Sequence, residues 1–322
     1  MRVAITGGSG SLGTALIGRL ADMGAERIVT FSRDEQKRLA MAEKYRAHPG
    51  IKVYAGDIRD RHRLADLFVG CEVVVHAAAR KVVSGHHDEP REMLQTNVIG
   101  TENVISAARN AKVGKMLFIS SDKAVRAENV YGMSKAMAEQ LVISENARSW
   151  PQGQRMSVIR YGNVLGSNGS VLKIWKQAAE TGAMLRVSDE RMTRFWLTIE
   201  QAAEFVLAAV ACMRGGEVLV PQLKAASLLE LAEAVAPGYA TTNIGIRPGG
   251  EKLHEELLSA AEARRTVRRH GFYVVTPTAG LDSWDGSPWP GEPVSEGFTY
   301  QSDSWPLRYS PDTLRELLAE AK

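Results

Sequence analysis

The first half of the chain alternates short apolar runs with longer segments of helical periodicity. The apolar runs are dense in Val and Ile and show little alternation with polar residues, which is typical of strands covered on both faces. They predict strands over residues 2–6, 27–32, 52–55, 73–77, 115–120 and 157–160. Helices are predicted between them, over residues 12–23, 34–45, 61–68, 92–111 and 131–149. This alternation predicts an α/β fold with a doubly wound parallel sheet.

The second half is less regular. It predicts helices over residues 201–213, 227–235 and 311–321, a buried strand over 217–221 and a long loop over 280–297. No stretch of linker composition separates these elements from the first half, so we expect two interleaved domains. The larger domain comprises residues 1–165, rejoined by 195–222, and a smaller substrate-binding domain comprises residues 166–194 and 223–322.

Composition and charge narrow the classes of function. The 322 residues are 44% hydrophobic and 24% charged, with a net charge of +3, which is ordinary for a soluble globular protein. There is no dense basic run with interleaved aromatic residues, so we expect no nucleic-acid partner. The longest apolar stretch, near residues 205–213, is too short to cross a membrane, and no basic-then-apolar leader opens the chain. We expect a cytoplasmic protein that does not contact membranes.

The cysteines and histidines do not indicate a metal site. Cys71 and Cys212 lie in or beside apolar runs, which favours two buried free thiols over a disulfide. The seven histidines show no spacing typical of metal ligands, and the pair His86 and His87 is expected in an exposed loop. The sequence therefore predicts no metal.

A glycine-rich turn follows the first predicted strand and opens the first predicted helix. Its glycines let the backbone turn tightly and approach a pyrophosphate, while the helix N-terminus offers free N–H groups to that anion. A strand–helix turn also uses glycine for steric reasons alone. Its place at the start of an α/β pattern favours a dinucleotide bound by a Rossmann-type domain. The predicted contacts are Gly7, Ser9, Gly10, Ser11, Leu12 and Gly13.

The end of the second predicted strand indicates which dinucleotide binds. Ser32 and Arg33 stand where an acid would bind the ribose of NAD, and Lys37 follows one helical turn later. A hydroxyl and two cations suit a 2′-phosphate, so we favour NADP. Asp34 is either a helix cap or the acid that binds NAD, which leaves NAD as the alternative. After the third and fourth strands, the residues expected to contact the cofactor are Asp57, Ile58, Ala77, Ala78 and Ala79.

Tyr131 and Lys135 form the first candidate catalytic pair. They are four residues apart on a predicted helix and so share one face. An ammonium lowers the pKa of a nearby phenol and binds the cofactor's ribose, and the phenolate then takes a proton from a sugar hydroxyl as hydride leaves. Ser121 is placed to bond the same hydroxyl.

Asp122 and Lys123 form the second candidate pair. They follow the fifth predicted strand, at the carboxyl edge where sheets of this kind have their cleft, as an acid and a base. The alternative interpretation is an ion pair that only shapes the loop.

These residues together resemble the extended short-chain dehydrogenase/reductase family. Within it, the chain is similar to the inverting UDP-N-acetylglucosamine (UDP-GlcNAc) 4,6-dehydratases of the polysaccharide biosynthesis type. The resemblance covers nearly the whole chain. Besides the glycine turn, it rests on residues 32–37, 76–81, 96–97, 121–123, 129–135, 160–167, 191–196, 245–248 and 252–255.

The resemblance implies a reaction sequence. Hydride passes from C4 of the hexosamine to NADP, with Tyr131 as base and Lys135 assisting. Lys123 then removes the C5 proton, Asp122 protonates the C6 hydroxyl that leaves, hydride returns to C6, and C5 is reprotonated with inversion. Retaining relatives that dehydrate dTDP-glucose carry Asp–Glu at this acid–base pair. The residues that the resemblance places at the sugar nucleotide are Lys81 (also at the cofactor), Asn163, Val171, Arg194, Arg247 and Glu251.

The chain departs from the pattern of these dehydratases at several positions. Ser121 stands where they usually have Thr, which keeps the hydroxyl. The run from Arg247 to Glu251 has one glycine more than usual, which moves the two charges relative to each other. We expect these departures to affect the substrate more than the chemistry. The other replacements are Leu by Arg80, His by Val82, Asn by Arg126 and Pro by Ala127.

Two other functions stay open. A sugar-nucleotide 4- or 5-epimerase would use the same cofactor and Tyr131 without losing water, although 4-epimerisation needs no acid such as Asp122 for a C6 hydroxyl. A non-catalytic NADP-binding scaffold predicts loss of the Tyr–Lys or the Asp–Lys pair, and both pairs are present. Members of the family often form dimers or hexamers, so we expect a homo-oligomer that acts on a nucleotide sugar.

Overall fold

The structure is a computed structural model that describes residues 1–81, 89–167, 169–247, 250–277 and 288–321. Val82, the pair His86 and His87, Gly249 and residues 280–287 of the loop predicted over 280–297 lie outside these residues. The loop prediction is wrong at its end, because Glu292–Pro293 forms a short strand that pairs with residues 267–268.

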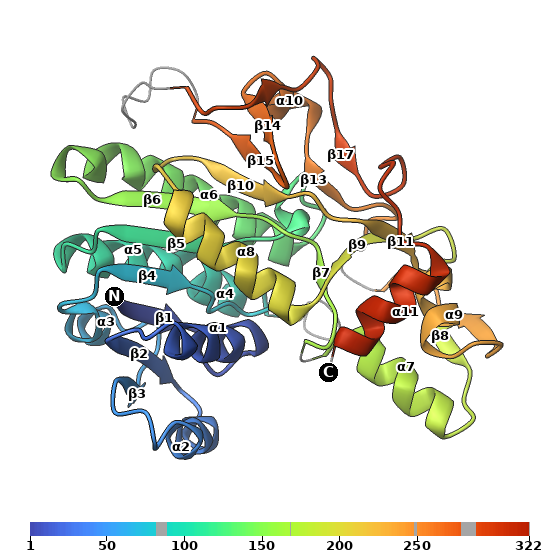
Figure 1. The fold of residues 1–322 in the computed structure, drawn as a ribbon, viewed down its shortest axis with the longest axis horizontal. Helices are drawn as coiled ribbons and strands as arrows, with labels where there is room; N and C mark the ends of the chain where they lie inside the picture. The colour runs from blue at the N-terminus through green and yellow to red at the C-terminus, as the bar shows by residue number, and fades with distance from the viewer. Residues whose placement is uncertain (82–88, 168, 248–249, 278–287, 322) are drawn as a thin grey trace.

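One large sheet forms the centre of the described structure (Figure 1). Its ten strands have the order β16-β14-β15-β10-β6-β5-β4-β1-β2-β3. The strands from β3 to β10 run parallel, and β15, β14 and β16 continue the sheet antiparallel. The bounds are β1 Arg2–Thr6, β2 Arg27–Ser32, β3 Ile51–Ala55, β4 Val73–His76, β5 Lys115–Ile119, β6 Arg155–Ile159, β10 Val218–Pro221, β14 Thr266–Arg269, β15 Phe272–Val275 and β16 Glu292–Pro293.

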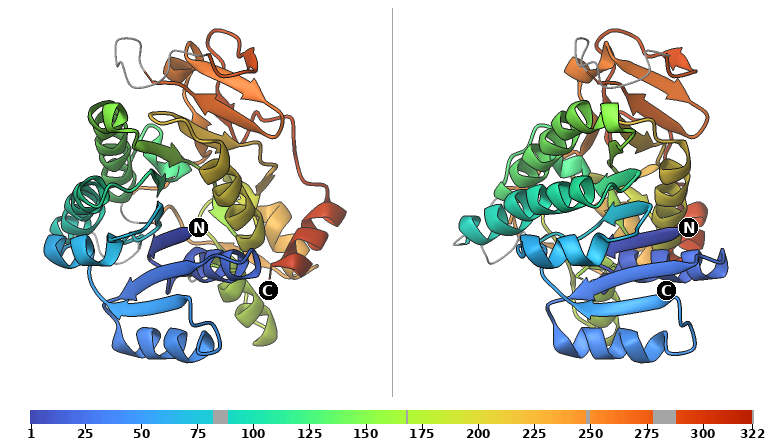
Figure 2. Two further views of the ribbon diagram at one scale, coloured as in Figure 1. Left: turned by 60° about the vertical axis from the view of Figure 1, so that its left-hand side comes forward. Right: turned by 90° about the vertical axis from the view of Figure 1, so that its left-hand side faces the viewer.

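The predicted fold class is confirmed. The six strands predicted in the first half are present, with ends that differ by at most two residues. Their Val- and Ile-rich runs are buried because helices cover both faces of the sheet. Helices α3, α5 and α6 lie on one face, while α1 and α8 pack together on the other (Figure 2). The bounds are α1 Ser11–Asp22, α2 Glu35–Lys44, α3 Arg61–Phe68, α5 Gly100–Asn110, α6 Val130–Ser149 and α8 Ile199–Cys212.

The helix predicted over residues 92–111 is not continuous. It consists of α4 (Pro90–Met93), a π-helical segment (Leu94–Ile99) and α5. The buried Asn97 side chain accepts a hydrogen bond from the N–H of Arg80 (2.8 Å), and it donates to the carbonyl of Arg80 (2.9 Å) and to the Ser134 hydroxyl (2.9 Å). These contacts join the segment after β4 to helix α6. Local propensity does not reveal such a widened turn, because its partners are distant in sequence.

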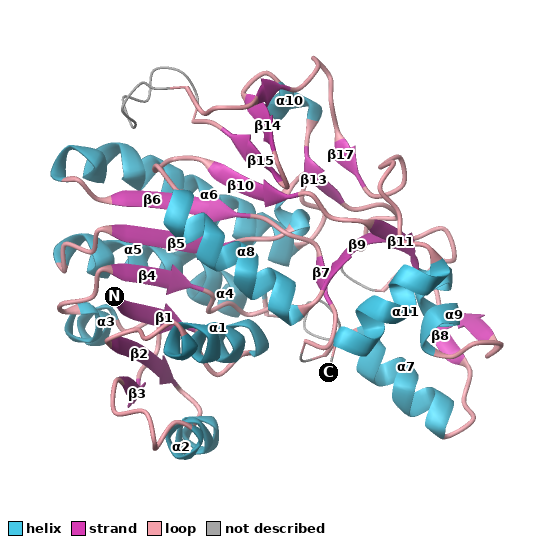
Figure 3. Cartoon of the chain, in the orientation of Figure 1, coloured by secondary structure: helices cyan, strands magenta, loops and turns pink. Residues whose placement is uncertain are grey.

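The second half of the chain builds a smaller lobe beside the carboxyl edge of the large sheet (Figure 3). Its core is a separate hydrophobic cluster that includes Leu172, Trp175, Leu231 and Leu314. It comprises a three-stranded sheet (β11-β9-β7), the β12–β8 pair and helices α7, α9 and α11. The β13–β17 pair instead packs Leu257, Leu258 and Tyr300 into the core of the large sheet. The bounds are β7 Asn163–Val164, α7 Val171–Glu180, β8 Leu185–Val187, β9 Thr193–Leu197, β11 Ala225–Ser227, α9 Leu228–Val235, β12 Thr241–Asn243, β13 Glu256–Leu258, α10 Ala260–Ala263, β17 Tyr300–Gln301 and α11 Pro311–Glu320.

The two predicted domains do not coincide with the large sheet and the smaller sheet. Helix α8 and strand β10, from the segment predicted to rejoin the larger domain, lie with the large sheet, but β9 belongs to the smaller one. Strands β14, β15 and β16 extend the large sheet from a segment assigned to the substrate domain. The division into two functional domains stays a prediction.

Several negative findings concern the described residues alone. Among them, no helix is both long and apolar enough to traverse a bilayer. They include no cluster of three or more His, Cys, Asp or Glu side chains that could hold a metal ion. Both cysteines are free thiols; Cys71 is buried, whereas Cys212 is partly exposed rather than buried as predicted.

Candidate active site

The glycine turn between β1 and α1 packs closely against the end of β4. Gly7 has a φ of 74°, and a Cβ there would lie 2.8–2.9 Å from backbone atoms of Ala77 and Ala78. A Cβ on Gly13 would lie 2.4 Å from the carbonyl oxygen of Gly7. Gly10 caps α1 without a side-chain hydrogen bond. The turn therefore needs glycine, and it leaves the helix N-terminus open to an anion.

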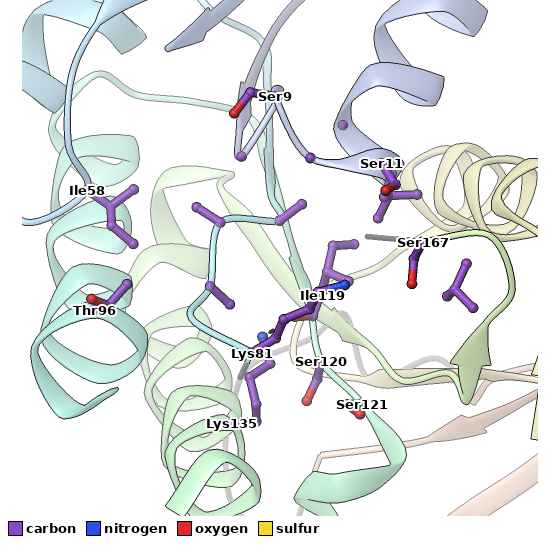
Figure 4. Close-up of a pocket in the computed structure, with 18 of the residues that line it drawn as sticks. Ser9, Ser11, Ile58, Lys81, Thr96, Ile119, Ser120, Ser121, Lys135 and Ser167 are labelled. Atoms are coloured by element: carbon purple, nitrogen blue, oxygen red, sulfur yellow. Dashed lines mark hydrogen bonds between the residues drawn. The ribbon is translucent and has the colours of Figure 1, made fainter. Parts of the chain in front are cut away.

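A cavity of about 590 Å³ extends from this turn along the carboxyl edge of the sheet (Figure 4). This volume is in the range typical of small-molecule sites. All predicted cofactor contacts line it: Gly7, Ser9, Gly10, Ser11, Leu12, Gly13, Ser32, Arg33, Lys37, Asp57, Ile58, Ala77, Ala78, Ala79, Lys81, Tyr131 and Lys135. The close backbone approach and the open helix end fit the phosphates of a dinucleotide, so these residues are suited to hold one.

Some residues that line the cavity were missed by the sequence reasoning. Tyr161 and Gly162 follow β6, and Ile199 begins α8. The position of Tyr161 was predictable, because the carboxyl ends of parallel strands meet at one edge and β6 neighbours β5. No signal in the sequence pointed to Ile199, which reaches the cavity from the other face of the sheet.

At the end of β2, hydrogen bonds organise the turn into α2. The Asp34 carboxylate accepts a hydrogen bond from the Lys37 N–H (3.0 Å), so Asp34 caps the helix, as one of the two interpretations expected. Arg33 is exposed, and its guanidinium lies 3.7 Å from the Asp57 carboxylate. Burial works to raise the pKa of Asp57, but hydrogen bonds from Arg59 and the nearby charges outweigh it and hold this pKa below its usual value.

Helix α6 brings Tyr131 and Lys135 to the cavity. Asn129 caps the helix through a hydrogen bond from the Gly132 N–H (2.8 Å), and a Cβ on Gly132 would lie 2.2 Å from the Lys123 carbonyl oxygen. Gly132 therefore lets the start of α6 pack against the Asp122–Lys123 turn, next to Tyr131. The Lys135 ammonium donates to the Ile119 carbonyl and lies 4.0 Å from the centroid of the Phe118 ring.

Burial sets the resting protonation of both residues. Withdrawal from water lowers the pKa of Lys135 to about 7, although the charge of Glu139 opposes this. Withdrawal from water raises the pKa of Tyr131 to about 12, and the largest opposing influence is the Lys123 ammonium.

Asp122 and Lys123 form a short 3-10 turn directly after β5. The Asp122 carboxylate accepts hydrogen bonds from the Ser121 hydroxyl (2.7 Å) and the Lys123 ammonium (3.1 Å). Asp122 is fully buried and does not line the cavity, whereas Ser121 and Lys123 do. Ser121 therefore stands between the buried carboxylate and the cavity.

A third charged side chain belongs to this cluster. The Glu255 carboxylate lies 2.9 Å from the Lys123 ammonium, and its side chain is 3% exposed. Burial and the neighbouring Glu255 carboxylate raise the pKa of Asp122, which favours its protonated form. Burial works to lower the pKa of Lys123, but the two carboxylates outweigh it and raise this pKa. Glu255 lies within residues 252–255, which carry part of the family resemblance, but no role was predicted for it.

The residues predicted to bind the sugar nucleotide are dispersed. Lys81 and Asn163 line the cavity, whereas Val171 is the first residue of α7 outside it. Arg194 is buried, and it donates to the carbonyls of Thr193 and Leu253 (2.8 and 3.0 Å). These roles stay predictions.

The segment with the additional glycine touches the catalytic helix. Arg247 and Glu251 form an ion pair with each other, outside the cavity lining. The Asn129 side chain donates to the carbonyl of Gly250 (3.1 Å), whose φ is 89°. The binding roles of Arg247 and Glu251 also stay predictions.

Comparison with known proteins identifies the family. Residues 3–277 match the family described as polysaccharide biosynthesis protein. The chain is 36% identical to the inverting UDP-N-acetylglucosamine 4,6-dehydratase of Campylobacter jejuni, over 98% of this chain and 96% of that protein. The chain belongs to the polysaccharide biosynthesis protein family. The resemblance to extended short-chain dehydrogenases/reductases is thereby confirmed.

Other members of this family and fold carry different names. The chain is 36% identical to the UDP-glucose 4-epimerase of Rickettsia typhi, over 86% of this chain and 83% of that protein. The crystal structure of Pen from Bacillus thuringiensis has a TM-score of 0.90 and 29% identity, with 99% of this chain and 97% of Pen covered. DesIV of Streptomyces venezuelae, a dTDP-glucose 4,6-dehydratase solved with NAD, has a TM-score of 0.70 at 21% identity over 78% of this chain and 86% of its own, which shows the fold alone.

The glycine turn gives a direct test of the site. Gly13→Ala forces a Cβ against the Gly7 carbonyl, so we expect a loss of about 1–3 kcal/mol in the free energy of unfolding and weakened dinucleotide binding. Gly18 lies on the same helix with open space around its Cβ position, so Gly18→Ala should stabilise by about 0.5–1 kcal/mol. Urea unfolding and calorimetric titration measure both. Equal affinities in the two variants would contradict the assignment of the turn.

Proposed function

We propose that the protein is an NADP-dependent 4,6-dehydratase of a UDP-N-acetylhexosamine, with UDP-GlcNAc as substrate, that forms a 4-keto-6-deoxy sugar with inversion at C5. The observation that carries this proposal is the contact of the buried Asp122 carboxylate with Lys123, which lines the same cavity as Tyr131. A dehydration that passes through a ketone needs one base for the C4 hydroxyl and an acid–base pair for C5 and C6. The relatives that match nearly the whole chain carry the name of that activity.

The first proton transfer falls to Tyr131. In the resting site burial raises its pKa to about 12, so the phenol is protonated at neutral pH. A bound nicotinamide would accept the C4 hydride and later return a hydride to C6. Before turnover the phenol releases its proton to solvent through the cavity and the Lys123 ammonium stabilises the resulting phenolate, which then takes the proton of the C4 hydroxyl. Ser121 lines the same part of the cavity and can bond that hydroxyl.

The elimination falls to Lys123 and Asp122. The side chain of Lys123 is 24% exposed and lines the cavity, so it can reach C5. It must be neutral to accept the C5 proton, so its ammonium first gives a proton to the Asp122 carboxylate at 3.1 Å, which makes Asp122 the acid. Asp122, with its raised pKa, is suited to donate a proton to the departing C6 hydroxyl. Because Asp122 is buried, the Ser121 hydroxyl at 2.7 Å is the route by which that proton enters the cavity.

An epimerase is the second candidate. The Rickettsia relatives named UDP-glucose 4-epimerase match as well per aligned residue, although over less of the chain. What favours the dehydratase is the buried carboxyl group of Asp122 behind Ser121, since 4-epimerisation removes no hydroxyl and needs no such proton.

The direct test is incubation of the purified protein with NADP and UDP-GlcNAc, followed by mass spectrometry. We expect a product that has lost one water and no net consumption of NADP, because the hydride returns to the product. A product of unchanged mass that separates from UDP-GlcNAc would indicate an epimerase instead. UDP-glucose serves as a matched substrate control.

The role of Lys123 can be separated from its charge. Lys123→Arg keeps a cation between the two carboxylates, but a guanidinium stays charged and cannot accept a proton. We expect it to fold and bind NADP, yet to lose dehydration and the exchange of the C5 hydrogen with D₂O by about 10²-fold or more. Lys123→Ala should lose both as well while NADP stays bound. Dehydration at the wild-type rate by either variant would refute Lys123 as the base.

The preference for NADP is supported by two cations at the cavity rim, Arg33 and Lys37, and by the use of Asp34 as a helix cap. We expect Arg33→Ala to weaken NADP binding by about tenfold and to leave NAD binding unchanged, because only NADP has the 2′-phosphate. Arg38 lies on the same helix, is bonded to Glu35 (3.3 Å) and does not line the cavity. Arg38→Ala is therefore the matched control. An equal loss for both dinucleotides would count against NADP specificity.

A further inference from the structure

Glu255 is held rigidly at the back of the acid–base pair. It directly precedes β13, and its backbone N–H donates to the Ser302 hydroxyl (2.9 Å) while its carbonyl accepts from the Ser302 N–H (2.9 Å). The Ser302 hydroxyl is in turn 2.6 Å from that of Thr193 on β9. These buried contacts fix the position from which the Glu255 side chain reaches Lys123.

Charged and titratable groups from four elements face the Glu255 carboxylate. The Lys123 ammonium is 2.9 Å away, the Arg194 guanidinium 3.9 Å and the Lys252 ammonium 3.8 Å. The Lys252 ammonium also points to the backbone of the acid–base turn, with the Asp122 carbonyl at 3.5 Å. The full set is Asp122 and Lys123 after β5, Tyr131 on α6, Arg194 on β9 and Lys252 before β13.

Two carboxylates share one ammonium in this arrangement. The Lys123 ammonium donates to Asp122 at 3.1 Å and lies 2.9 Å from Glu255. When two carboxylates lie this close in a buried place, one is favoured as the anion and the other as the neutral acid. Glu255 has the additional cations Arg194 and Lys252 beside it, whereas Asp122 has none besides Lys123 among the described residues. Glu255 is thus the anion, and Asp122 keeps the proton.

We propose that Glu255 is a positioning residue for the elimination: its carboxylate anchors the Lys123 ammonium from behind and leaves Asp122 as the acid that protonates the leaving hydroxyl. This inference rests on the proposed function. Glu255 is buried and does not line the cavity, so it acts through Asp122 and Lys123 and does not touch the sugar.

The neighbouring carboxylate provides a matched control. Glu256 is buried next to Glu255 in the sequence, but it binds the Arg126 guanidinium through two hydrogen bonds of 2.5 Å. Loss of either buried charge disturbs an ion pair and lowers stability. Only Glu255 contacts the acid–base pair.

The experiment compares Glu255→Gln, Glu255→Asp and Glu256→Gln in the dehydration of UDP-GlcNAc across pH. Glu255→Gln removes a negative charge beside Lys123 and Asp122, which lowers the pKa of both groups. The optimum of kcat should therefore move to lower pH, with kcat at neutral pH reduced about tenfold or more and KM and NADP affinity within about twofold of wild type. Glu255→Asp keeps the negative charge but draws it one methylene further from Lys123, so it should move the pH optimum of kcat less than Glu255→Gln does. Glu256→Gln should keep the wild-type optimum.

A second measurement does not need turnover. In protein with ¹⁵N-labelled lysine, the Lys123 signal is assigned by its absence in Lys123→Arg and is followed across pH. We expect Lys123 to titrate at lower pH in Glu255→Gln than in wild type, and at the wild-type pH in Glu256→Gln. An unchanged titration of Lys123 in Glu255→Gln overturns the proposal.

The pH profile of dehydration and the titration of Lys123 together distinguish failure of this inference from failure of the proposed function. If Glu255→Gln does not fold, Glu255→Asp carries the test, and a wild-type pH profile in that variant overturns the proposal. If the wild-type protein removes no water from UDP-GlcNAc, the proposed function fails, while the lysine titration still decides whether Glu255 sets the protonation of Lys123.

Discussion

The site depends on one ammonium held between two buried carboxylates. Lys123 lies at the carboxyl end of β5, 3.1 Å from Asp122 and 2.9 Å from Glu255, and both carboxylates are buried. A buried carboxylate without a cation would be very costly, so both require Lys123. This constraint ties the end of β5 to the segment that precedes β13.

The close packing around this cluster explains the small residues near it. Gly132 lets helix α6 approach the Lys123 carbonyl, and Gly7 lets the dinucleotide turn approach the end of β4. Asn97 in the π-helical segment joins the loop after β4 to α6. These contacts place the glycine turn, Tyr131 and Lys123 around one cavity, because neighbouring parallel strands end at the same edge.

The sequence predicted well which residues at strand ends line the cavity, since they follow the strands directly, while their roles in cofactor binding stay predictions. The glycine turn, Ser32, Asp57 and Ala77 all line the cavity at strand ends, as the α/β pattern implied. The substrate half was predicted less completely. Arg194 lies behind Glu255 instead of lining the cavity, and it comes from a lobe whose strands have only two to five residues. Strands this short show too little hydrophobic periodicity to be predicted from the sequence, and their packing depends on residues distant in the chain.

The sequence by itself predicted the fold class and the glycine turn after the first strand, because each depends on residues within a few positions of one another. The pairing of Tyr131 with Lys135 stays a prediction. Tertiary structure alone decided which charged groups are in contact. Glu255 is 132 residues from Lys123 by their numbering, yet its carboxylate is in contact with the ammonium. It also decided that Asp122 is buried behind Ser121 and that Lys123, rather than Lys135, opposes the rise in the pKa of Tyr131. Burial and charge proximity are properties of the folded chain, and they fix the protonation on which the chemistry depends.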